Sequence, residues 1–218
     1  MPVCQENTKK YQKLLELGSA TVCEAQSSMG VLDSRIRPIH QSMKMVGPAV
    51  TLDVMPGDNL MLHYALLKTA PGDVLVVDAK GFLGAGIWGD ILAEQAVFKG
   101  LAGIVVNGAI RDTAELIKMN FPAFCKAICI KGTSKIQPGK LNVPVVIGNV
   151  NINPGDIVLA DTDGIVIIPQ DSLDTVLEKA IARDEKETKI RELIRAGEVT
   201  VDLLNLRNAL EENNLTLD

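Results

Sequence analysis

The sequence predicts an α/β fold with a central strand–helix–strand unit and a second half rich in strands. Three observations support this fold class. Apolar, β-branched runs at residues 74–77 and 103–106 are typical of strands buried on both faces, and a helical pattern at 90–99 joins them. After Phe121 the apolar runs alternate with turn pairs such as Pro154-Gly155. A chain of 218 residues with 47% hydrophobic residues can bury one substantial core, so we expect a single domain.

The segment before the central unit combines helical patterns with one strand. We expect helices at residues 9–17, 21–28 and 59–68 and a strand at 46–54. Gly18 and Gly30 stand where the first two helices would end in C-caps or turns. Asp58 is the expected N-cap of the third helix.

The segment after the central unit begins with a helix at 112–119 and then changes to strands. Four strands are predicted, at residues 123–130, 143–147, 157–160 and 165–168. We expect hairpins rather than helical crossovers to connect them. A charged stretch without Pro or Gly predicts one long amphipathic helix at 172–195, and a last helix is expected at 201–211.

Composition and charge exclude several classes of function. A net charge of −5 and few aromatic residues (3%) disfavour binding to nucleic acid. No apolar run approaches the roughly 20 residues that a membrane helix needs, and residues 1–10 lack the apolar stretch of a secretory signal. We therefore expect a cytoplasmic protein without membrane contact. The four scattered cysteines suit small buried side chains rather than disulfides; they are Cys4, Cys23, Cys125 and Cys129.

The first candidate for chemistry is the glycine-rich segment 84–89, which matches GxGxxG between a strand and a helix. A dinucleotide site would also need an acidic residue at the end of the next strand, where Asn107 stands, so that interpretation is disfavoured. Glycines still let the backbone approach a ligand, and the free N–H groups of the helix that begins at Asp90 attract an anion, either phosphate or carboxylate. The alternative is a tight turn packed against its neighbours.

The second candidate is the pair Arg111-Asp112, directly after the second apolar strand. Ligand sites of open α/β sheets gather at the carboxyl ends of the strands, and Asp90 should face the same cleft. Arg111 can bind a carboxylate or an enolate oxygen through two parallel hydrogen bonds. Asp112 can hold a hard cation such as Mg²⁺, which takes one or two protein carboxylates and keeps several waters. The alternative is an N-cap at Asp112 with a salt bridge to Arg111.

Together these residues resemble a known family. Asp90, twenty further residues, Arg111-Asp112 and then Glu115 are similar to the D-x20-R-D pattern of the 4-hydroxy-4-methyl-2-oxoglutarate aldolases, which share their fold with the regulator of ribonuclease E activity A. The resemblance extends over residues 21–198. Other matching stretches are Gly47-Pro48-Ala49-Val50-Thr51, Gly57-Asp58-Asn59, Pro71-Gly72-Asp73-Val74, Pro154-Gly155-Asp156 and Asp161-Thr162-Asp163-Gly164 through to Pro169.

The resemblance implies one RraA-like domain over residues 1–218, of the swivelling β/β/α type, whose C-terminal helices from about residue 171 contact a neighbouring subunit. It implies a lyase dependent on Mg²⁺ or Mn²⁺ that cleaves a 4-hydroxy-2-oxo acid, of the 4-hydroxy-4-methyl-2-oxoglutarate type, to pyruvate. Oxaloacetate decarboxylation is expected through the same pyruvate enolate. A homotrimer, or a homohexamer of two stacked trimers, is the implied assembly.

The resemblance also implies residue roles. Asp112 would be the direct metal ligand, and Asp90 would act through a metal-bound water. Arg111 would bind the ketone and enolate oxygen. The other implied substrate contacts are Gly89, Asp90, the amides of Ile91 and Leu92, which would receive the pyruvate carboxylate, and Asn59. An acid from a neighbouring subunit would reach the metal's waters, with Glu187 the first candidate and Glu198 the second. Glu115 matches a family position without an assigned role.

The sequence also allows one alternative function and contains several weaker candidates for site residues. The main alternative is a non-catalytic binding protein like the ribonuclease regulators, which tend to lack the acid that stands here at Asp112. A methyltransferase finds no support in the residues. Lys80 is expected to be a solvated loop residue rather than a Schiff-base lysine. His40 and His63 are expected in core or surface roles, and Asp161-Thr162-Asp163-Gly164 in a hairpin turn rather than a calcium site.

Overall fold

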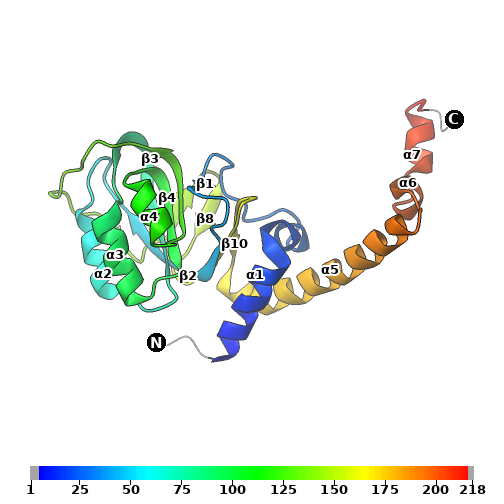
Figure 1. Ribbon diagram of the computed structural model, residues 1–218, viewed down its shortest axis with the longest axis horizontal. Helices are drawn as coiled ribbons and strands as arrows, with labels where there is room; N and C mark the ends of the chain where they lie inside the picture. The colour runs from blue at the N-terminus through cyan, green and yellow to red at the C-terminus, as the bar shows by residue number, and fades with distance from the viewer. Residues whose placement is uncertain (1–4, 216–218) are drawn as a thin grey trace.

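A mixed sheet forms the centre of the computed structural model, which describes residues 5–215 (Figure 1). Its strands lie in the order β1-β5-β4-β3-β2-β9-β10, and β6 also pairs with β2. The strands of this sheet are β1 (Arg37–Pro38), β2 (Met45–Asp53), β3 (Val74–Gly86), β4 (Gly103–Ile110), β5 (Ala123–Ile128), β6 (Lys140–Leu141), β9 (Ile157–Ala160) and β10 (Ile165–Ile168). A separate hairpin consists of β7 (Val145–Ile147) and β8 (Val150–Ile152).

Helices cover the sheet on one face and continue beyond it. They are α1 (Gln5–Ala25), α2 (Leu60–Lys68), α3 (Asp90–Lys99), α4 (Thr113–Lys118), α5 (Leu173–Arg195), α6 (Thr200–Leu203) and α7 (Arg207–Glu212), with a short 3-10 turn at Gln170–Ser172. In Figure 1, α2, α3 and α4 lie together against the central strands, and α1 lies beside α5 at the other end of the sheet. The fold is therefore mixed α/β, as predicted.

The central strand–helix–strand unit is confirmed. β2, β3, β4 and β5 run parallel to one another, and α3 connects β3 to β4. Strands β3 and β4 are apolar because both faces are covered: Leu75 and Val77 pack against α2 and α3, and Val74 and Val76 pack against β7 and β8. Parallel strands place their carboxyl ends at one edge of the sheet, and the helices α3 and α4 start there.

Both central strands are longer than the sequence indicates. β3 continues to Gly86 and β4 to Ile110, because register shifts after Asp78 and Phe82 let the two strands keep pairing past the apolar runs. Residues 84–86 therefore belong to the end of β3 and not to a free loop.

Several other boundaries differ from the prediction. β5 is parallel to β4, so hairpins begin only with β7. The last predicted helix is two short helices, α6 and α7, and β1, β6 and β8 were not predicted. The two N-terminal helices are confirmed as two helical segments within α1, separated by the non-helical Gly18 (φ 81°), although the second ends at Ala25. The turn after Asp161 joins β9 to β10 as a hairpin, as expected.

The C-terminal helices extend away from the sheet. The first turns of α5 are buried against α1 through Leu173, Val176 and Ala180. Beyond them α5, α6 and α7 form an arm that projects from the rest of the chain (Figure 1). The arm exposes apolar side chains, namely Leu193, Ile194, Val199, Leu204 and Leu206. None of the helices in residues 5–215 combines the length and the apolar character that crossing a membrane requires.

The cysteines are thiols in the described part of the chain. Cys125 is buried, and burial raises the pKa of its thiol to about 11, which fits a small core side chain. Cys23 and Cys129 are half-buried. Cys4 lies outside the described residues.

Candidate active site

A small cavity opens where β3 and β4 end and α3 begins. Its volume is about 160 Å³, which suits a molecule of a few carbon atoms and lies below the roughly 300–1,000 Å³ of drug-sized pockets. The lining residues are Asn59, His63, Gly86, Gly89, Asp90, Ile91, Leu92, Arg111 and Lys135. The fold thus brings together six of the residues predicted from the sequence, and it adds His63 and Lys135.

Gly89 and Gly86 allow close contacts at the floor of this cavity. Gly89 has an extended backbone (φ −149°, ψ −170°) that any residue can adopt, so its conformation does not require glycine. The surroundings of Gly89 do require glycine, because a Cβ atom there would overlap the Asp112 carboxylate and lie 3.1 Å from Arg111 Nε. At Gly86 a Cβ would lie 2.8 Å from the Arg111 Cβ. The two glycines therefore let the backbone approach the Arg111-Asp112 pair.

Asp112 is not among the residues that line the cavity, but its carboxylate contacts three that are, Gly89, Asp90 and Arg111. It occupies the N-cap position of α4 in the left-handed region (φ 55°) and makes no side-chain capping hydrogen bond. Its Oδ2 instead lies 3.1 Å from Arg111 Nε and accepts the Asp90 N–H at 3.4 Å. The alternative of an N-cap with a salt bridge to Arg111 is confirmed in position and in the ion pair, but the Asp112 side chain makes no capping hydrogen bond. With 35% of the side chain exposed, the carboxylate can accept a cation.

A hydrogen bond fixes the backbone of Arg111, whereas its guanidinium is accessible. Its N–H donates to the Trp88 carbonyl at 2.8 Å, and the Trp88 ring is buried and stacked on Phe121 at 5.8 Å between centroids. The side chain keeps 40% of its surface exposed, so the guanidinium can turn to a ligand in the cavity. A rigid backbone with an accessible guanidinium is suited to binding a carboxylate or an oxyanion.

The start of α3 supplies backbone donors to the same cavity. The first N–H groups of a helix have no acceptor within the helix and carry its positive dipole end. In the structure the Ile91 N–H donates to Asp90 Oδ1 at 2.8 Å. A carboxylate ligand would compete with the Asp90 side chain for this donor, whereas Leu92 lines the cavity without such a bond.

Asn59 and His63 line the cavity from α2. The Asn59 Nδ2 donates to the Ile87 carbonyl at 3.1 Å, while its Oδ1 is buried without a hydrogen-bond partner. His63 Nε2 is also buried without a partner. Burial, with Lys135 nearby, lowers the pKa of His63 below its ordinary value of 6.5. Two buried polar atoms without a hydrogen-bond partner, both on residues that line one cavity, indicate a ligand site.

The prediction for His63 is therefore corrected: it lies at the cavity. The four-residue spacing from Asn59 places both on one side of a helix, and this signal was available in the sequence. Lys135 lies in the segment between β5 and β6, far along the chain from any predicted site residue. No local pattern marks it.

The groups at or beside the cavity that could hold a metal ion are the Asp90 and Asp112 carboxylates, His63 Nε2 and Asn59 Oδ1. Within residues 5–215, no three His, Cys, Asp or Glu side chains gather into a metal-binding group. Asp90 and Asp112 are two hard oxygen donors beside one cavity. Mg²⁺ and Mn²⁺ suit such a set because they accept few protein carboxylates and retain waters, whereas zinc would favour His or Cys ligands. The donor set thus fits the predicted class of ion.

The remaining predicted acids lie outside the cavity of their own chain. Glu115 forms an exposed ion pair with Lys118 at 3.4 Å. Glu187 is on the projecting part of α5, where its carboxylate contacts Arg183 and Arg191, both at 2.9 Å. Glu198 follows the end of α5 and is exposed.

Lys80 has a different environment from the one predicted. Lys80 lies within β3, and its Nζ is 2.6 Å from Asp53 at the end of β2 and 2.7 Å from Asp78 in β3. Asp78 is buried and also accepts from Asn107 Nδ2 at 2.7 Å. Lys80 therefore links β2 and β3 through ion pairs and is not simply solvated.

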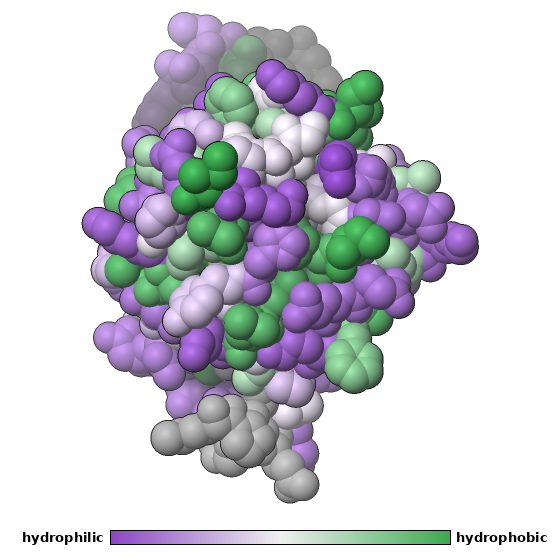
Figure 2. Space-filling view, turned by 90° about the vertical axis from the view of Figure 1, so that its left-hand side faces the viewer, coloured by the Kyte–Doolittle hydropathy of each residue, from purple (hydrophilic) through white to green (hydrophobic). Residues whose placement is uncertain are grey.

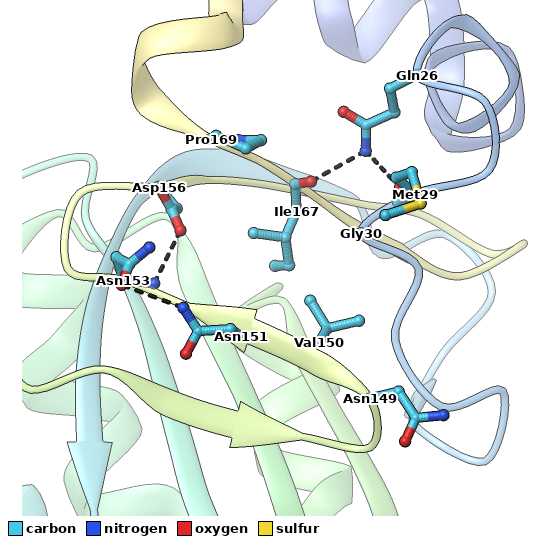
Figure 3. Close-up of a pocket in the computed structure, with 10 residues that line it drawn as sticks. All are labelled: Gln26, Met29, Gly30, Asn149, Val150, Asn151, Asn153, Asp156, Ile167 and Pro169. Atoms are coloured by element: carbon cyan, nitrogen blue, oxygen red, sulfur yellow. Dashed lines mark hydrogen bonds between the residues drawn. The ribbon is translucent and has the colours of Figure 1, made fainter.

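A second, larger cavity of about 330 Å³ lies between the loop after α1 and the hairpin β7–β8 (Figure 3). Its polar lining consists of amides and one carboxylate, namely Gln26, Asn149, Asn151, Asn153 and Asp156. The Asp156 carboxylate accepts the Asn153 N–H at 2.8 Å, and Gln26 donates to the carbonyls of Met29 and Ile167. Without a cationic side chain in its lining, this cavity does not suit an organic acid. The smaller cavity remains the candidate active site.

Comparisons with known proteins identify the family of the chain. The model of the RraA-like family (Aldolase/RraA) matches residues 19–167. A protein of Halalkalibacterium halodurans, provisionally named a 4-hydroxy-4-methyl-2-oxoglutarate aldolase, is 37% identical over 191 residues, which cover 88% of this chain and 89% of that protein.

Two solved structures are similar over nearly the whole chain. An uncharacterized protein from Pseudomonas syringae pv. tomato has a TM-score of 0.81 and 28% identity, covering 91% of this chain and 92% of its own. Streptomyces coelicolor RraAS2, an unusual member of the RNase ES inhibitor RraA protein family, has a TM-score of 0.77 and 32% identity, covering 84% and 97%. On the extent of the family match and the identity to its members, the chain belongs to the RraA-like family.

Proposed function

We propose that this protein is a divalent-metal-dependent lyase. It would cleave a 4-hydroxy-2-oxo acid of the 4-hydroxy-4-methyl-2-oxoglutarate type to pyruvate and would decarboxylate oxaloacetate. The supporting observation is that Arg111, Asp90 and the start of α3 line one cavity of about 160 Å³, and that the Asp112 carboxylate contacts both Arg111 and the Asp90 N–H. The name of the Halalkalibacterium relative supports the same class of reaction.

Asp112 would be the direct ligand of Mg²⁺ or Mn²⁺, and Asp90 would hold one of the waters of that ion. When bound, the ion supplies a Lewis acid beside the 2-oxo group of the substrate. Asp112 is suited to this role because its carboxylate is exposed, makes no capping bond and faces Asp90.

Arg111 would stabilise the charge that develops during bond cleavage. When the bond beyond C3 breaks, electrons move into the 2-oxo group and its oxygen becomes negative, as in an enolate. A guanidinium that is already placed at this oxygen stabilises the transition state more than the uncharged ground state. The same charge develops whether an aldehyde, a ketone or CO₂ leaves, so one site could serve both reactions.

The first turn of α3 would orient the substrate. Its carboxylate would accept from the Leu92 N–H and displace the Asp90 side chain from the Ile91 N–H. Gly89 leaves room for this approach, and the unpartnered Oδ1 of Asn59 and Nε2 of His63 could bind a hydroxyl group or water.

Lys135 would bind the second carboxylate of the substrate. The cationic side chains in the cavity lining are Arg111 and Lys135, and both of the substrates proposed carry two carboxylates. A second cation therefore matches the second anionic group, while a monocarboxylate such as pyruvate would use only the Arg111 side of the cavity.

A neighbouring subunit would complete the site. One chain provides two carboxylates at the cavity, and its own Glu187 and Glu198 lie on the projecting arm. We infer that the helices from about residue 171 reach another copy, in a homotrimer or a homohexamer, and that Glu187, or else Glu198, faces the waters of that copy's metal ion. The exposed apolar side chains of the arm would be covered there. On the face seen in Figure 2, apolar and polar side chains are intermixed.

A regulatory role is the competing function, because RraAS2 belongs to an inhibitor family. A protein that acts only through contacts with another protein needs no cation-accessible carboxylate beside a buried cavity. The Asp112 geometry therefore favours catalysis.

The decisive experiment measures pyruvate release from oxaloacetate and from 4-hydroxy-4-methyl-2-oxoglutarate. We expect turnover with Mg²⁺ or Mn²⁺, none with EDTA, and none for Asp112→Ala. Glu94→Gln changes an exposed acid one turn further along α3 and should retain activity. Turnover that survives EDTA or Asp112→Ala would refute the metal assignment, and absence of turnover on both substrates would favour the regulatory function.

A further inference from the structure

Lys135 lies on a segment that has little apolar packing to hold it. Residues 134–138 are all exposed, and Ile136 has 78% of its surface in solvent. Such a segment is mobile unless hydrogen bonds hold it. The position of a cationic side chain on it therefore depends on whatever fixes the backbone on both sides of Lys135.

The Asp58 carboxylate makes those bonds. Its Oδ2 accepts from Ser134 Oγ at 2.6 Å, from the Ile136 N–H at 2.8 Å and from the Gln137 N–H at 3.1 Å. Residues immediately before and after Lys135 thus bind the same oxygen. Asp58 itself is 2% exposed, so solvent does not compete for these bonds.

The other oxygen of Asp58 binds the start of α2, which also contributes residues to the cavity. Its Oδ1 accepts the Leu60 N–H at 2.9 Å, in the first turn of α2, so Asp58 supplies the bond expected of the N-cap although Asn59 occupies that position. Helix α2 carries His63, and Asn59 directly precedes it. Backbone bonds between Asn59 and Ser134 (3.1 Å) and between Ser134 and Gly57 (2.9 Å) join the same two segments.

The charge of Asp58 is maintained by this arrangement. The donors of Ile136, Ser134, Leu60 and Gln137 together outweigh the effect of burial and lower the pKa of Asp58 to about 2. The carboxylate is therefore ionised at any pH at which the protein would work, and hydrogen bonds to an ionised acceptor are stronger than neutral ones.

We propose that Asp58 is a positioning residue: by binding both neighbours of Lys135 it holds that lysine at the cavity and so sets the preference for substrates with a second carboxylate. This inference rests on the proposed function for its effect on catalysis. Asp58 does not line the cavity, so it acts on the substrate through the residues that it holds in place.

Asp58→Asn tests the proposal with little change in shape. The variant replaces one oxygen by an NH₂ group, which cannot accept the donors of residues 134–137. We expect the KM for oxaloacetate to rise about tenfold or more, since a displaced Lys135 loses a charge-assisted hydrogen bond, while kcat changes by less than about threefold. Lys135→Gln should raise KM similarly, and the double variant should be no worse than Lys135→Gln alone.

Pyruvate provides the internal control. Exchange of its methyl protons with deuterium from D₂O removes a proton from C3 and returns a deuteron, and it requires no second carboxylate. We expect the exchange rate at saturating pyruvate to be the same in Asp58→Asn and in wild-type protein. An equal loss with both substrates would overturn the proposal, because it would place the effect on the whole site.

Amide hydrogen exchange tests the position of the segment without any turnover. In Asp58→Asn the amides of Ile136 and Gln137 should exchange at the rate of an open loop, and unchanged protection would refute the role of Asp58 even if the wild-type protein had no lyase activity. Absence of wild-type turnover would instead refute the proposed function.

Two further variants show whether a change in KM in Asp58→Asn comes from general destabilisation. Asp156→Asn removes another buried carboxylate that accepts backbone N–H groups, from Asn153 and Gln170, and it should leave the KM for oxaloacetate unchanged. Ser134→Ala removes one exposed donor to Asp58. If Asp58→Asn does not fold, Ser134→Ala should still raise KM by about threefold. A KM that equals the wild-type value in Ser134→Ala, or one that rises equally in Asp156→Asn, would refute the proposal.

Discussion

Gly89→Ala should inactivate the proposed lyase without harming its stability. The extended backbone at Gly89 accepts alanine without strain, so the folded state is not penalised there. The added Cβ would overlap Asp112 Oδ2, and restoring van der Waals contact requires the carboxylate to move by about 1 Å. Misplacement of that size in an active site typically lowers turnover by about 100-fold, or about 2.7 kcal/mol of transition-state stabilisation.

Gly89→Ala should leave stability unchanged or higher but lower kcat/KM. Opposite effects of this kind indicate displacement of the Asp112 carboxylate and not general destabilisation. Replacing Gly by Ala at a compatible backbone conformation reduces the entropy of the unfolded chain and stabilises a protein by about 0.4–1 kcal/mol. Because the Asp112 and Arg111 side chains are partly exposed, they can shift without a large cost in packing. We therefore expect the Tm of Gly89→Ala to equal or slightly exceed that of wild-type protein while kcat/KM for oxaloacetate falls.

Gly164→Ala is the matched control, since no atom lies within 4 Å of a Cβ built there. It should leave kcat/KM unchanged. Steady-state pyruvate release and thermal unfolding should be measured on both variants. If kcat/KM of Gly89→Ala stays within a few-fold of wild type, the Asp112 carboxylate is not needed at its observed position and the site assignment is wrong.

Three further predictions follow from the same geometry. Arg111→Ala should lower kcat/KM for oxaloacetate by about 100-fold or more, because it removes the charged donor to the developing oxyanion; a few-fold loss in steady-state kinetics would contradict this role. The pKa of Asp58 is lowered from 3.8 to about 2, so its stabilising contribution is complete above pH 3.8 and is lost as the pH falls through 2. The urea midpoint of Asp58→Asn should therefore fall less than that of wild-type protein between about pH 5 and pH 2; equal falls would contradict the assignment. Refolding Asp112→Ala together with Glu187→Gln should restore part of the activity that each lacks alone, and recovery only with Glu198→Gln would assign the second acid to Glu198.

The fold could be predicted where local pattern and tertiary structure agree. The runs at residues 74–77 and 103–106 are apolar at every position because both faces of β3 and β4 are covered, and that requirement is visible in the sequence. Their continuation to Gly86 and Ile110 was missed, since it depends on register shifts between paired strands and not on hydrophobicity. The two-residue strands β1 and β6 were missed because two residues carry no periodicity.

The site could be predicted where its residues follow strands. Asp90 and Arg111 stand at the ends of β3 and β4 in chain order, so the topology of a parallel unit places them together. Lys135 lines the cavity from a segment whose residues Ser134 and Ile136 bind Asp58, which stands 77 positions earlier than Lys135 in the chain. A contact made by an exposed segment and a buried carboxylate has no local sequence signal.

The conformation of Asp112 is the strongest structural argument for a ligand at this site. A left-handed backbone costs a residue with a Cβ atom about 1 kcal/mol, and Asp at an N-cap position would ordinarily offset such a cost by bonding the first turn of its helix. Asp112 makes no such bond, and its carboxylate lies beside Arg111 and Gly89 instead. Packing gains nothing from this arrangement, because the side chain is one-third exposed. A costly conformation that leaves the carboxylate one-third exposed, with Oδ2 paired to Arg111, is accounted for when a cation also binds the carboxylate, and this is the role that the proposed function assigns to it.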